Sequence, residues 1–385
     1  MLNYLIMKVT GKCNLGCDYC YYMTDLAAPF RKRVKQETIF QVYQKYADYA
    51  RENALKQVTF CWHGGEPTLL GKDFFRSILA KQSDYFNGDI QVRNLIQSNG
   101  TLLDDEWAEL FNHHNFSVGI SIDGSPNSHD RARSYHNGHG SYADVIDSLN
   151  VLTKNKVQFG VITVIDPNMS GHDVFMHHYS LGIRSMDFLL PVLTQDSFHQ
   201  LYDQDAVSKF ARFMCELFDA WMEKDDPEVS ISGLENLTRL IAGGKSNHCN
   251  TANKCDQYIT IEPNGDVGIC EDARVIQNKN INAIDSLSEF YLTKTNINTH
   301  SFIEIEKAVG IKFAAHEYNS RGDICSTCLV KDICNSGCSV HRYRSVENNF
   351  QNPSFFCELY KTVIKHIADF YEYEIGKYKV GGVIM

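Results

Sequence analysis

Three cysteines near the N-terminus have a spacing that suits an iron–sulfur cluster. Cys13, Cys17 and Cys20 form the array C-x3-C-x2-C. A [4Fe–4S] cluster takes a thiolate on each of its four irons, so three cysteines leave one iron open to a small molecule, as at other catalytic metal centres. A zinc site that lacks one ligand, or cysteines scattered by chance, are the alternatives that the spacing alone leaves open.

A glycine-rich run follows the predicted strand Gln57–Cys61, and its residues are His63-Gly64-Gly65-Glu66-Pro67. Paired glycines allow a backbone to approach a ligand closely, and a carboxylate such as that of Glu66 can accept a hydrogen bond from an ammonium group. A purely structural turn is the alternative for a Gly-Gly pair taken by itself.

Short polar side chains stand at the ends of the next two predicted strands. Ser98 and Asn99 end one of them, and Ser121 and Asp123 end the other. Their hydroxyl, amide and carboxylate groups suit the hydroxyls of a ribose. Turn formation is the alternative, since both sites are followed by glycine and Asn-Gly and Asp-Gly pairs are common in turns.

Eight further cysteines fall in two groups in the last third of the chain. A tight C-x2-C pair with distant partners is how a chain wraps a metal–sulfur centre, because the thiolates must converge from several loops. Two structural zinc sites also fit eight thiolates. Cys61 and Cys215 stand apart, and we expect them to be buried apolar residues. The eight are Cys249, Cys255, Cys270, Cys325, Cys328, Cys334, Cys338 and Cys357.

The N-terminal array, with Tyr19 before its last cysteine, and the glycine-rich run resemble the signatures of the radical SAM superfamily. The resemblance implies that the free iron holds S-adenosylmethionine and that an electron from the cluster cleaves it to a 5′-deoxyadenosyl radical. It also implies that the run Gly64-Gly65-Glu66-Pro67 contacts the amino group of this ligand. Ser121 and Asp123 would bind its ribose and Arg133 its carboxylate, while Tyr19 would pack near its adenine. A solvated basic turn is the alternative for Arg133, and core filling is the alternative for Tyr19.

The eight later cysteines resemble, in order and spacing, the SPASM domain of radical SAM maturases. The resemblance implies two fully ligated auxiliary [4Fe–4S] clusters, which with the first makes three. It assigns Cys249, Cys255, Cys270 and Cys338 to auxiliary cluster I, and Cys325, Cys328, Cys334 and Cys357 to auxiliary cluster II. Such clusters would carry away the electron left after hydrogen abstraction, and the first cluster would need an external electron donor such as flavodoxin or ferredoxin.

Two groups of maturases fit this pattern. Anaerobic sulfatase maturases oxidise a Cys or Ser to formylglycine, and other maturases install carbon–carbon, cyclophane or thioether cross-links in ribosomally made precursor peptides. This chain departs from the sulfatase group in having His63 where that group has Gln, and Glu271, followed by Asp272, where it has Asp as the proposed base. Either carboxylate could take a proton, and His63 could contact substrate; solvated charge and a backbone hydrogen bond are the alternatives.

From these departures we expect a cross-linking peptide maturase, with formylglycine formation as the alternative. A non-catalytic iron–sulfur protein or a sensor of S-adenosylmethionine is the alternative from a different class. The net charge of −10 argues against nucleic-acid and anionic-membrane partners. With neither a long apolar run nor a signal peptide in its 385 residues, the chain is expected to be cytoplasmic.

The elements that must position these residues alternate along the first half of the chain. Strand–helix alternation predicts a parallel sheet with right-handed crossovers, and six units are too few to close a TIM barrel. The predicted fold class is therefore α/β, with a partial (β/α)6 barrel over residues 1–240 and a cysteine-rich domain over 241–385. Asn264-Gly265-Asp266 predicts a hairpin turn, and Phe355–Tyr378 a C-terminal helix. The predicted strands are Tyr4–Val9, Gln57–Cys61, Gln91–Ser98, Ser117–Ile122, Phe159–Val164 and Met186–Leu190, and the helices include Glu37–Glu52, Lys72–Gln82, Asp104–His113, Tyr142–Lys154 and Val207–Glu223.

Overall fold

The computed structural model describes most of the chain and divides it into two compact units. The first unit combines residues 1–163 and 256–316, and the second combines residues 164–255 and 317–385. Both units are made of separate stretches of sequence, whereas the predicted domains 1–240 and 241–385 are continuous; that domain division stays a prediction. The described residues are 1–23, 32–86, 88–252, 254–256, 258–277, 279–280, 282–316 and 322–372.

The first unit is built on a mixed sheet whose strand order is β10-β9-β8-β1-β2-β3-β4-β5. Strands β1 to β5 pair in parallel with their sequence neighbours, and β8 pairs in parallel with the other side of β1. Strands β8, β9 and β10 then continue the sheet with antiparallel pairs. The strands are β1 (Tyr4–Thr10), β2 (Gln57–Gly64), β3 (Gln91–Ser98), β4 (Ser117–Ser121), β5 (Phe159–Val164), β8 (Ile259–Ile261), β9 (Asp266–Gly268) and β10 (Leu292–Asn296).

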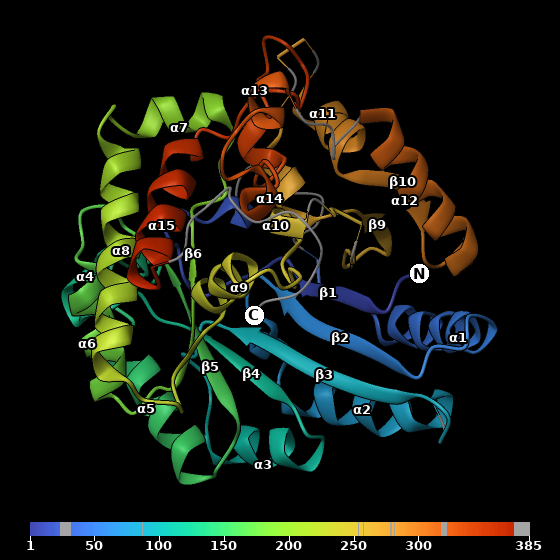
Figure 1. Ribbon diagram of the computed structural model, residues 1–385. Coiled ribbons are helices and arrows are strands. Elements are labelled where there is room, and N and C mark those ends of the chain that lie inside the picture. The colour runs from blue at the N-terminus through green and yellow to red at the C-terminus, as the bar shows by residue number, and fades with distance from the viewer. Residues whose placement is uncertain are drawn as a thin grey trace. The chain divides into compact units, whose positions relative to one another are not determined.

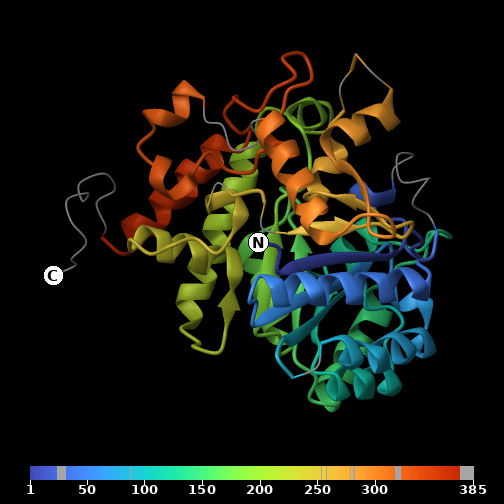
Figure 2. The same cartoon turned by 90° about the vertical axis from the view of Figure 1, so that its right-hand side faces the viewer.

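Amphipathic helices alternate with the parallel strands, as the hydrophobic periodicity predicts. In α1 the buried residues Ile39, Tyr43 and Tyr46 recur at helical spacing, and both tyrosine rings pack edge-on against Phe60 of β2. Figures 1 and 2 show α1, α2 and α3 together on one face of the parallel strands. The helices of this unit are α1 (Gln36–Glu52), α2 (Lys72–Tyr85), α3 (Asp105–His113), α4 (Pro126–Ala132), α5 (Tyr142–Lys154), α11 (Ala283–Phe290) and α12 (Phe302–His316).

The second unit is mostly helical. Its two strands, β6 (Ser185–Leu189) and β7 (Ser230–Ile231), pair in parallel, and the long helix α8 packs against both α6 and α15. His366 of α15 forms an ion pair with Asp219 of α8 at 2.6 Å. The helices are α6 (Gly171–Ser180), α7 (Gln195–Leu201), α8 (Ala206–Lys224), α9 (Ser232–Ile241), α10 (Cys249–Ala252), α13 (Asp323–Ser326), α14 (Lys331–Cys334) and α15 (Cys357–Phe370).

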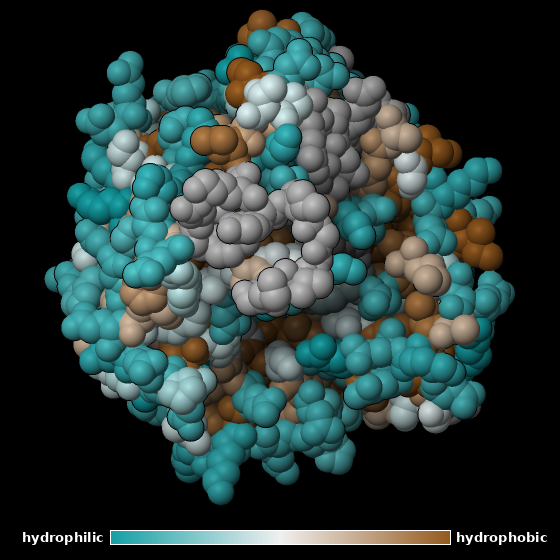
Figure 3. Space-filling view, in the orientation of Figure 1, coloured by the Kyte–Doolittle hydropathy of each residue, from teal (hydrophilic) through white to brown (hydrophobic). Residues whose placement is uncertain are grey.

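The predicted fold class, α/β with an unclosed parallel barrel, is confirmed. The hairpin turn also forms, since β8 and β9 flank Gly265, whose φ of +89° favours glycine. The predicted C-terminal helix begins at Cys357 and ends at Phe370, and residues 373–378 lie outside the described part of the chain. Among the described residues, no helix is long and apolar enough to cross a membrane, and Figure 3 shows that hydrophilic side chains dominate the visible face.

Candidate active site

The three cysteines of the N-terminal array lie on the loop that leaves β1 and are partly buried. Burial raises the pKa of Cys13 to about 12 and that of Cys17 to about 11; the charges of Cys17 and Cys20 raise the pKa of Cys13 further, and the charge of Cys20 raises that of Cys17. A metal ion reverses this preference, because coordination removes the thiol proton. This buried set of three thiols therefore fits an iron–sulfur cluster as its resident group.

In the described part of the chain, no three His, Cys, Asp or Glu side chains lie close enough to share one metal ion. A four-iron cluster has a different requirement, because each of its thiolates binds a different iron.

The paired glycines pack against the chain that leads into Cys13. A Cβ atom on Gly65 would lie 2.2 Å from the carbonyl oxygen of Lys12, and one on Gly64 would lie 2.4 Å from that of Thr10. The Gly65 N–H donates to the Thr10 carbonyl at 2.7 Å, and the Glu66 N–H donates to that of Lys12 at 2.8 Å. The close approach that explains the glycines is therefore to the backbone before the cysteine array.

Glu66 is fully buried and joins the ends of two strands. Its carboxylate accepts hydrogen bonds from Ser98 Oγ at 2.9 Å, the Asn99 N–H at 2.7 Å and the Thr68 N–H at 3.0 Å. Burial raises the pKa of Glu66 even though these donors oppose the shift. Pro67 begins the 3-10 helix Pro67–Leu70 directly after it. The hydrogen bond from Glu66 to a ligand ammonium stays a prediction.

Three of the predicted ligand-binding residues contact one another beside Cys17. Arg133 Nε donates to Asp123 Oδ2 at 2.8 Å, and the Tyr19 hydroxyl donates to the same oxygen. The Arg133 guanidinium also lies 5.2 Å from the centre of the Tyr19 ring. Because Arg133 and Asp123 are buried, the solvated basic turn is excluded for Arg133. The guanidinium charge opposes the upward shift of the Cys17 pKa that burial causes.

The remaining strand-end residues, Asn99 and Ser121, make separate polar contacts, and that of Asn99 is beside Cys13. Asn99 Nδ2 donates to Asn14 Oδ1 at 2.9 Å and lies 3.6 Å from Cys13 Sγ. Ser121 Oγ accepts a hydrogen bond from Gln97 Nε2 at 3.1 Å. Asn14 was not among the predicted site residues, although its place inside the cysteine array was a signal for it.

A buried lysine connects two of the predicted catalytic residues. Lys8, in the middle of β1, is 1% exposed and forms an ion pair with Glu271. Its ammonium also donates to His63 Nδ1 at 3.2 Å, and His63 Nε2 lies 3.9 Å from Glu271 Oε1. The Tyr21 hydroxyl donates to the same carboxylate. Lys8 and Tyr21 were missed from the sequence, although a lysine inside the otherwise apolar run of β1 was a signal.

The charges in this cluster decide what each side chain can do. Burial lowers the pKa of His63 to about 4, so the ring is neutral near pH 7. Burial opposes ionisation of Glu271, but Lys8, His63 and Tyr21 together lower its pKa to about 2, whereas burial and the Glu271 charge raise the pKa of Asp272 to about 7. The Gly64 N–H donates to His63 Nδ1 at 2.8 Å and the Lys8 ammonium at 3.2 Å, against one contact of this nitrogen with the Gly64 carbonyl at 3.2 Å. We therefore assign the ring proton to Nε2.

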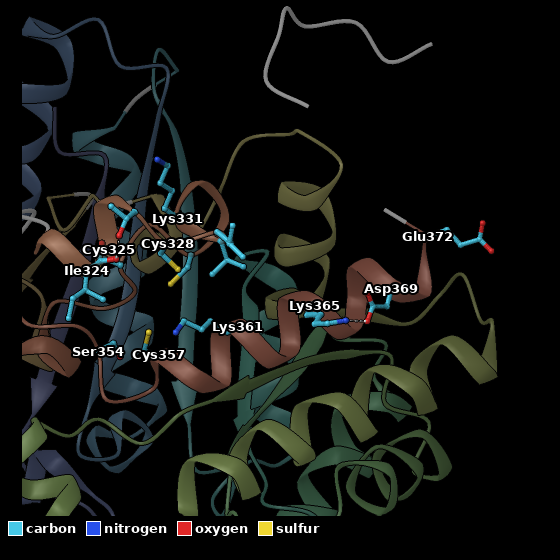
Figure 4. A pocket seen from close by; sticks show the side chains of 15 residues that line it. Ile324, Cys325, Cys328, Lys331, Ser354, Cys357, Lys361, Lys365, Asp369 and Glu372 are labelled. Carbon is cyan, nitrogen blue, oxygen red and sulfur yellow. Dashed lines mark hydrogen bonds and ion pairs between the residues drawn. The ribbon is translucent and has the colours of Figure 1, made fainter. Parts of the chain in front are cut away.

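Four of the later cysteines line one cavity of about 900 Å³ in the second unit, and Figure 4 shows it between α15 and the chain around Cys328. Burial raises the pKa of Cys334 to about 12, and the charges of Cys325, Cys328 and Cys357 raise it further. These four are the set that the resemblance assigns to auxiliary cluster II.

Of the other four later cysteines, Cys270 belongs to the first unit, and Cys249, Cys255 and Cys338 belong to the second. Cys270 lies two residues after the end of β9 in the first unit, and the Tyr258 hydroxyl lies 3.1 Å from its sulfur. In the second unit, Cys255 Sγ lies 3.2 Å from Ser339 Oγ. The convergence of Cys249, Cys255, Cys270 and Cys338 on one cluster stays a prediction.

The chain is similar to a known protein family and to several known proteins. The family model of the radical SAM superfamily matches residues 7–177. The chain is 29% identical to the cysteine-type anaerobic sulfatase-maturating enzyme of Clostridium novyi (strain NT), over 98% of this chain and 96% of the relative. It is 26% identical to a serine-type enzyme of Bacteroides thetaiotaomicron, over 96% of this chain and 90% of that protein.

Two solved structures share the fold. The structure of native anSMEcpe with bound AdoMet aligns with a TM-score of 0.83 and 24% identity, covering 96% of this chain and 97% of the other. Streptococcus suis SuiB bound to the precursor peptide SuiA aligns with a TM-score of 0.62 and 13% identity, covering 93% and 76%. At these identities the likeness extends to the fold alone.

Proposed function

Because the chain carries a radical SAM domain over residues 7–177, we propose that it oxidises a Cys or Ser of a protein substrate to formylglycine. The similarity to the Clostridium novyi enzyme over 98% of this chain and 96% of that one carries the proposal. It favours the reaction that the sequence alone placed second, because the relatives named for sulfatase maturation match both the barrel and the cysteine-rich region.

In this proposal, the N-terminal half of the first unit binds the cofactors. Cys13, Cys17 and Cys20 hold the first [4Fe–4S] cluster, and the buried Arg133, Asp123 and Tyr19 group lies beside it to orient S-adenosylmethionine. When bound, cluster and ligand supply the reductive cleavage that yields a 5′-deoxyadenosyl radical. Glu66 acts chiefly by fixing the glycine-rich run against the cysteine loop.

We assign His63 the role of a hydrogen-bond donor to the substrate, because the contact of Lys8 with His63 Nδ1 leaves the ring proton on Nε2. His63 is 24% exposed at its side chain and presents Nε2–H, which can donate to a backbone carbonyl of the substrate. Glu271 is held by Lys8 and Tyr21. We therefore assign proton removal from the substrate to Asp272 and a structural role to Glu271.

The eight later cysteines supply the electron path of the proposal. Their two auxiliary clusters would take up the electron left on the substrate after hydrogen abstraction, for a total of three clusters per chain. An external donor such as flavodoxin or ferredoxin would reduce the first cluster, and the reaction would take place in the cytoplasm. The cavity lined by Cys325, Cys328, Cys334 and Cys357 supports the second auxiliary site.

Cross-linking of a ribosomally made precursor peptide is the second candidate. The observation that favours it is the ion pair of Lys8 with Glu271. Glu271 follows Cys270, where sulfatase maturases are expected to place the base, and the ion pair engages this carboxylate. The shared fold with SuiB, solved with its precursor peptide, is compatible with this reaction.

Mass spectrometry of substrate peptides separates the two reactions. A sulfatase-derived peptide with a reactive Cys or Ser is incubated under anaerobic conditions with the reconstituted enzyme, S-adenosylmethionine and a reductant. The proposal predicts an aldehyde at that one residue. Loss of two hydrogens with a new residue-to-residue link in a co-expressed precursor peptide, and no aldehyde in the sulfatase peptide, would favour the second candidate.

A further inference from the structure

A serine hydroxyl lies among the four thiols of the cavity in the second unit. Ser336 lines this cavity together with Cys325, Cys328, Cys334 and Cys357, and it is 6% exposed. Its Oγ atom is buried and has no hydrogen-bond partner among the described residues. A buried hydroxyl without a partner costs free energy, so a native structure is expected to supply one. The group that the four thiols hold is the nearest candidate.

The backbone around Ser336 is strained, and the turn places the Ser336 N–H against one of the thiols. Asn335, Ser336 and Gly337 have φ values of 49°, 73° and 68°, and only the glycine adopts this region without cost. The Ser336 N–H donates to the Cys334 thiol and lowers its pKa against the effect of burial. The N–H groups on either side of it donate to backbone carbonyls instead, that of Asn335 to Lys331 at 2.9 Å and that of Gly337 to Cys334 at 3.0 Å. Strain of this kind concentrates at functional sites.

The other hydroxyl-bearing residues of the cavity are already engaged. Ser354 Oγ accepts a hydrogen bond from the Phe356 N–H at 3.1 Å, and Thr327 Oγ1 donates to the Ile324 carbonyl at 3.5 Å. Ser336 is therefore distinguished among these three hydroxyls as the one that neither donates nor accepts a hydrogen bond among the described residues.

We propose that the Ser336 hydroxyl donates a hydrogen bond to a sulfur of the auxiliary cluster held by Cys325, Cys328, Cys334 and Cys357, and that this bond raises the reduction potential of that cluster. The proposal rests on the proposed function, which supplies the cluster. Reduction adds one negative charge to the cluster, so a donor to its sulfur stabilises the reduced form more than the oxidised form. Ser336 is thus a tuning residue that makes this cluster the better electron acceptor.

Redox titration of the auxiliary clusters tests this role. The full chain with Cys13, Cys17 and Cys20 replaced by alanine keeps the eight later cysteines together with Cys61 and Cys215, and its two auxiliary clusters are titrated with detection by electron paramagnetic resonance. Ser336→Ala removes the hydroxyl and keeps the backbone strain, whereas Ser336→Gly removes both. Ser326→Ala is the matched control, because Ser326 also neighbours a cluster cysteine, is exposed, and already donates to the Asp323 carbonyl at 2.6 Å.

The expected result is a lower midpoint for one of the two clusters in both Ser336 variants and no change in Ser326→Ala. A tenfold fall in the ratio of reduced to oxidised cluster at a fixed potential corresponds to about 59 mV for one electron. An exchangeable proton coupled to the reduced cluster, seen by electron–nuclear double resonance in D2O exchange, should be lost in both variants.

The outcomes separate the two proposals. If the Ser336 variants keep the iron content of the parent and both midpoints stay unchanged, the hydrogen bond is refuted while the clusters stand. If the parent itself binds no iron at the eight cysteines, the proposed function fails first. A shift in Ser336→Ala that is absent in Ser336→Gly would assign the effect to backbone strain and would also overturn the role of the hydroxyl.

Discussion

The side chain that most changes the interpretation of the site is Lys8. From the sequence, Glu271 and Asp272 are equivalent candidates for a base, and His63 is a residue of open role. The buried ammonium of Lys8 distinguishes them, because it neutralises Glu271 and fixes the proton of His63 on Nε2. The sequence cannot supply this pairing, since residues 8 and 271 meet only when β8 pairs with β1 and brings the chain after β9 back to it.

Removal of Lys8 should lower the free energy of unfolding, because it breaks the buried ion pair with Glu271. Lys8→Met leaves the Glu271 carboxylate buried without its counter-ion, and breaking a buried pair in this way costs about 3–5 kcal/mol. In Lys8→Met/Glu271→Gln the uncompensated charge is gone, so most of that loss should be recovered. Chemical unfolding of the four proteins of this cycle, each with matched iron content, measures the effect. A double variant no more stable than Lys8→Met would contradict the assignment.

At the scale of single strands and helices, the sequence predicts well where the site residues lie along the chain. The bounds of β3, β5 and α5 follow from hydrophobic periodicity and agree with the structure. For Gly64 and Gly65, the sequence predicts a close backbone approach but does not predict what approaches them. The sequence indicates a close approach, but whether it is to a ligand or to the chain depends on where the loop after β1 lies, and that loop is positioned by long-range backbone hydrogen bonds.

Substitution in the glycine-rich run should therefore act through the cysteine loop. In Gly65→Ala, the new Cβ would lie 2.2 Å from the Lys12 carbonyl oxygen, so residues 12–13 must move. We expect this variant to lose iron from the first cluster. Gly310→Ala is the control, since Gly310 lies in α12 with no heavy atom within 4 Å of an added Cβ, and we expect it to keep full iron content. Iron and sulfide analysis after anaerobic reconstitution compares the two, and full iron content in Gly65→Ala would refute the mechanism.

At the level of the whole molecule, chain order and spatial grouping differ. The sequence predicts the six strand–helix units correctly because each is local. It cannot predict that residues 256–316 join the first unit, because that depends on pairing between β8 and β1, which are far apart in sequence. The same limit applies to the cysteines, since spacing identifies the ligands while the grouping of Cys357 with Cys325 and Cys328 depends on where α15 begins.

Buried neutral histidines should make the folded molecule sensitive to acid. Burial lowers the pKa of His129 to about 4, and its ring is held between the Asp123 N–H and Ser141 Oγ. In the unfolded chain the pKa is about 6.5. Between these values the unfolded state binds more protons, so stability falls as the pH drops from about 6.5 toward 4.

The slope of stability against pH tests this effect. His129→Gln should flatten the slope in that window, whereas His113→Gln, which changes an exposed side chain, should leave it unchanged. Thermal unfolding at pH 7.5, 6.5 and 5.5 with iron content monitored is sufficient. Equal slopes in the two variants and the parent would contradict the prediction.

Cleavage of S-adenosylmethionine tests most directly that this chain is a radical enzyme rather than a passive iron–sulfur or ligand-sensing protein. The anaerobically reconstituted full chain is reduced with dithionite, mixed with S-adenosylmethionine, and assayed for 5′-deoxyadenosine by liquid chromatography and mass spectrometry, with Cys17→Ala as the control. We predict about twelve irons per chain, four for each of three clusters, and 5′-deoxyadenosine from the parent alone. An iron-loaded, reduced parent that forms no 5′-deoxyadenosine, or forms no more than Cys17→Ala, would contradict the proposed function.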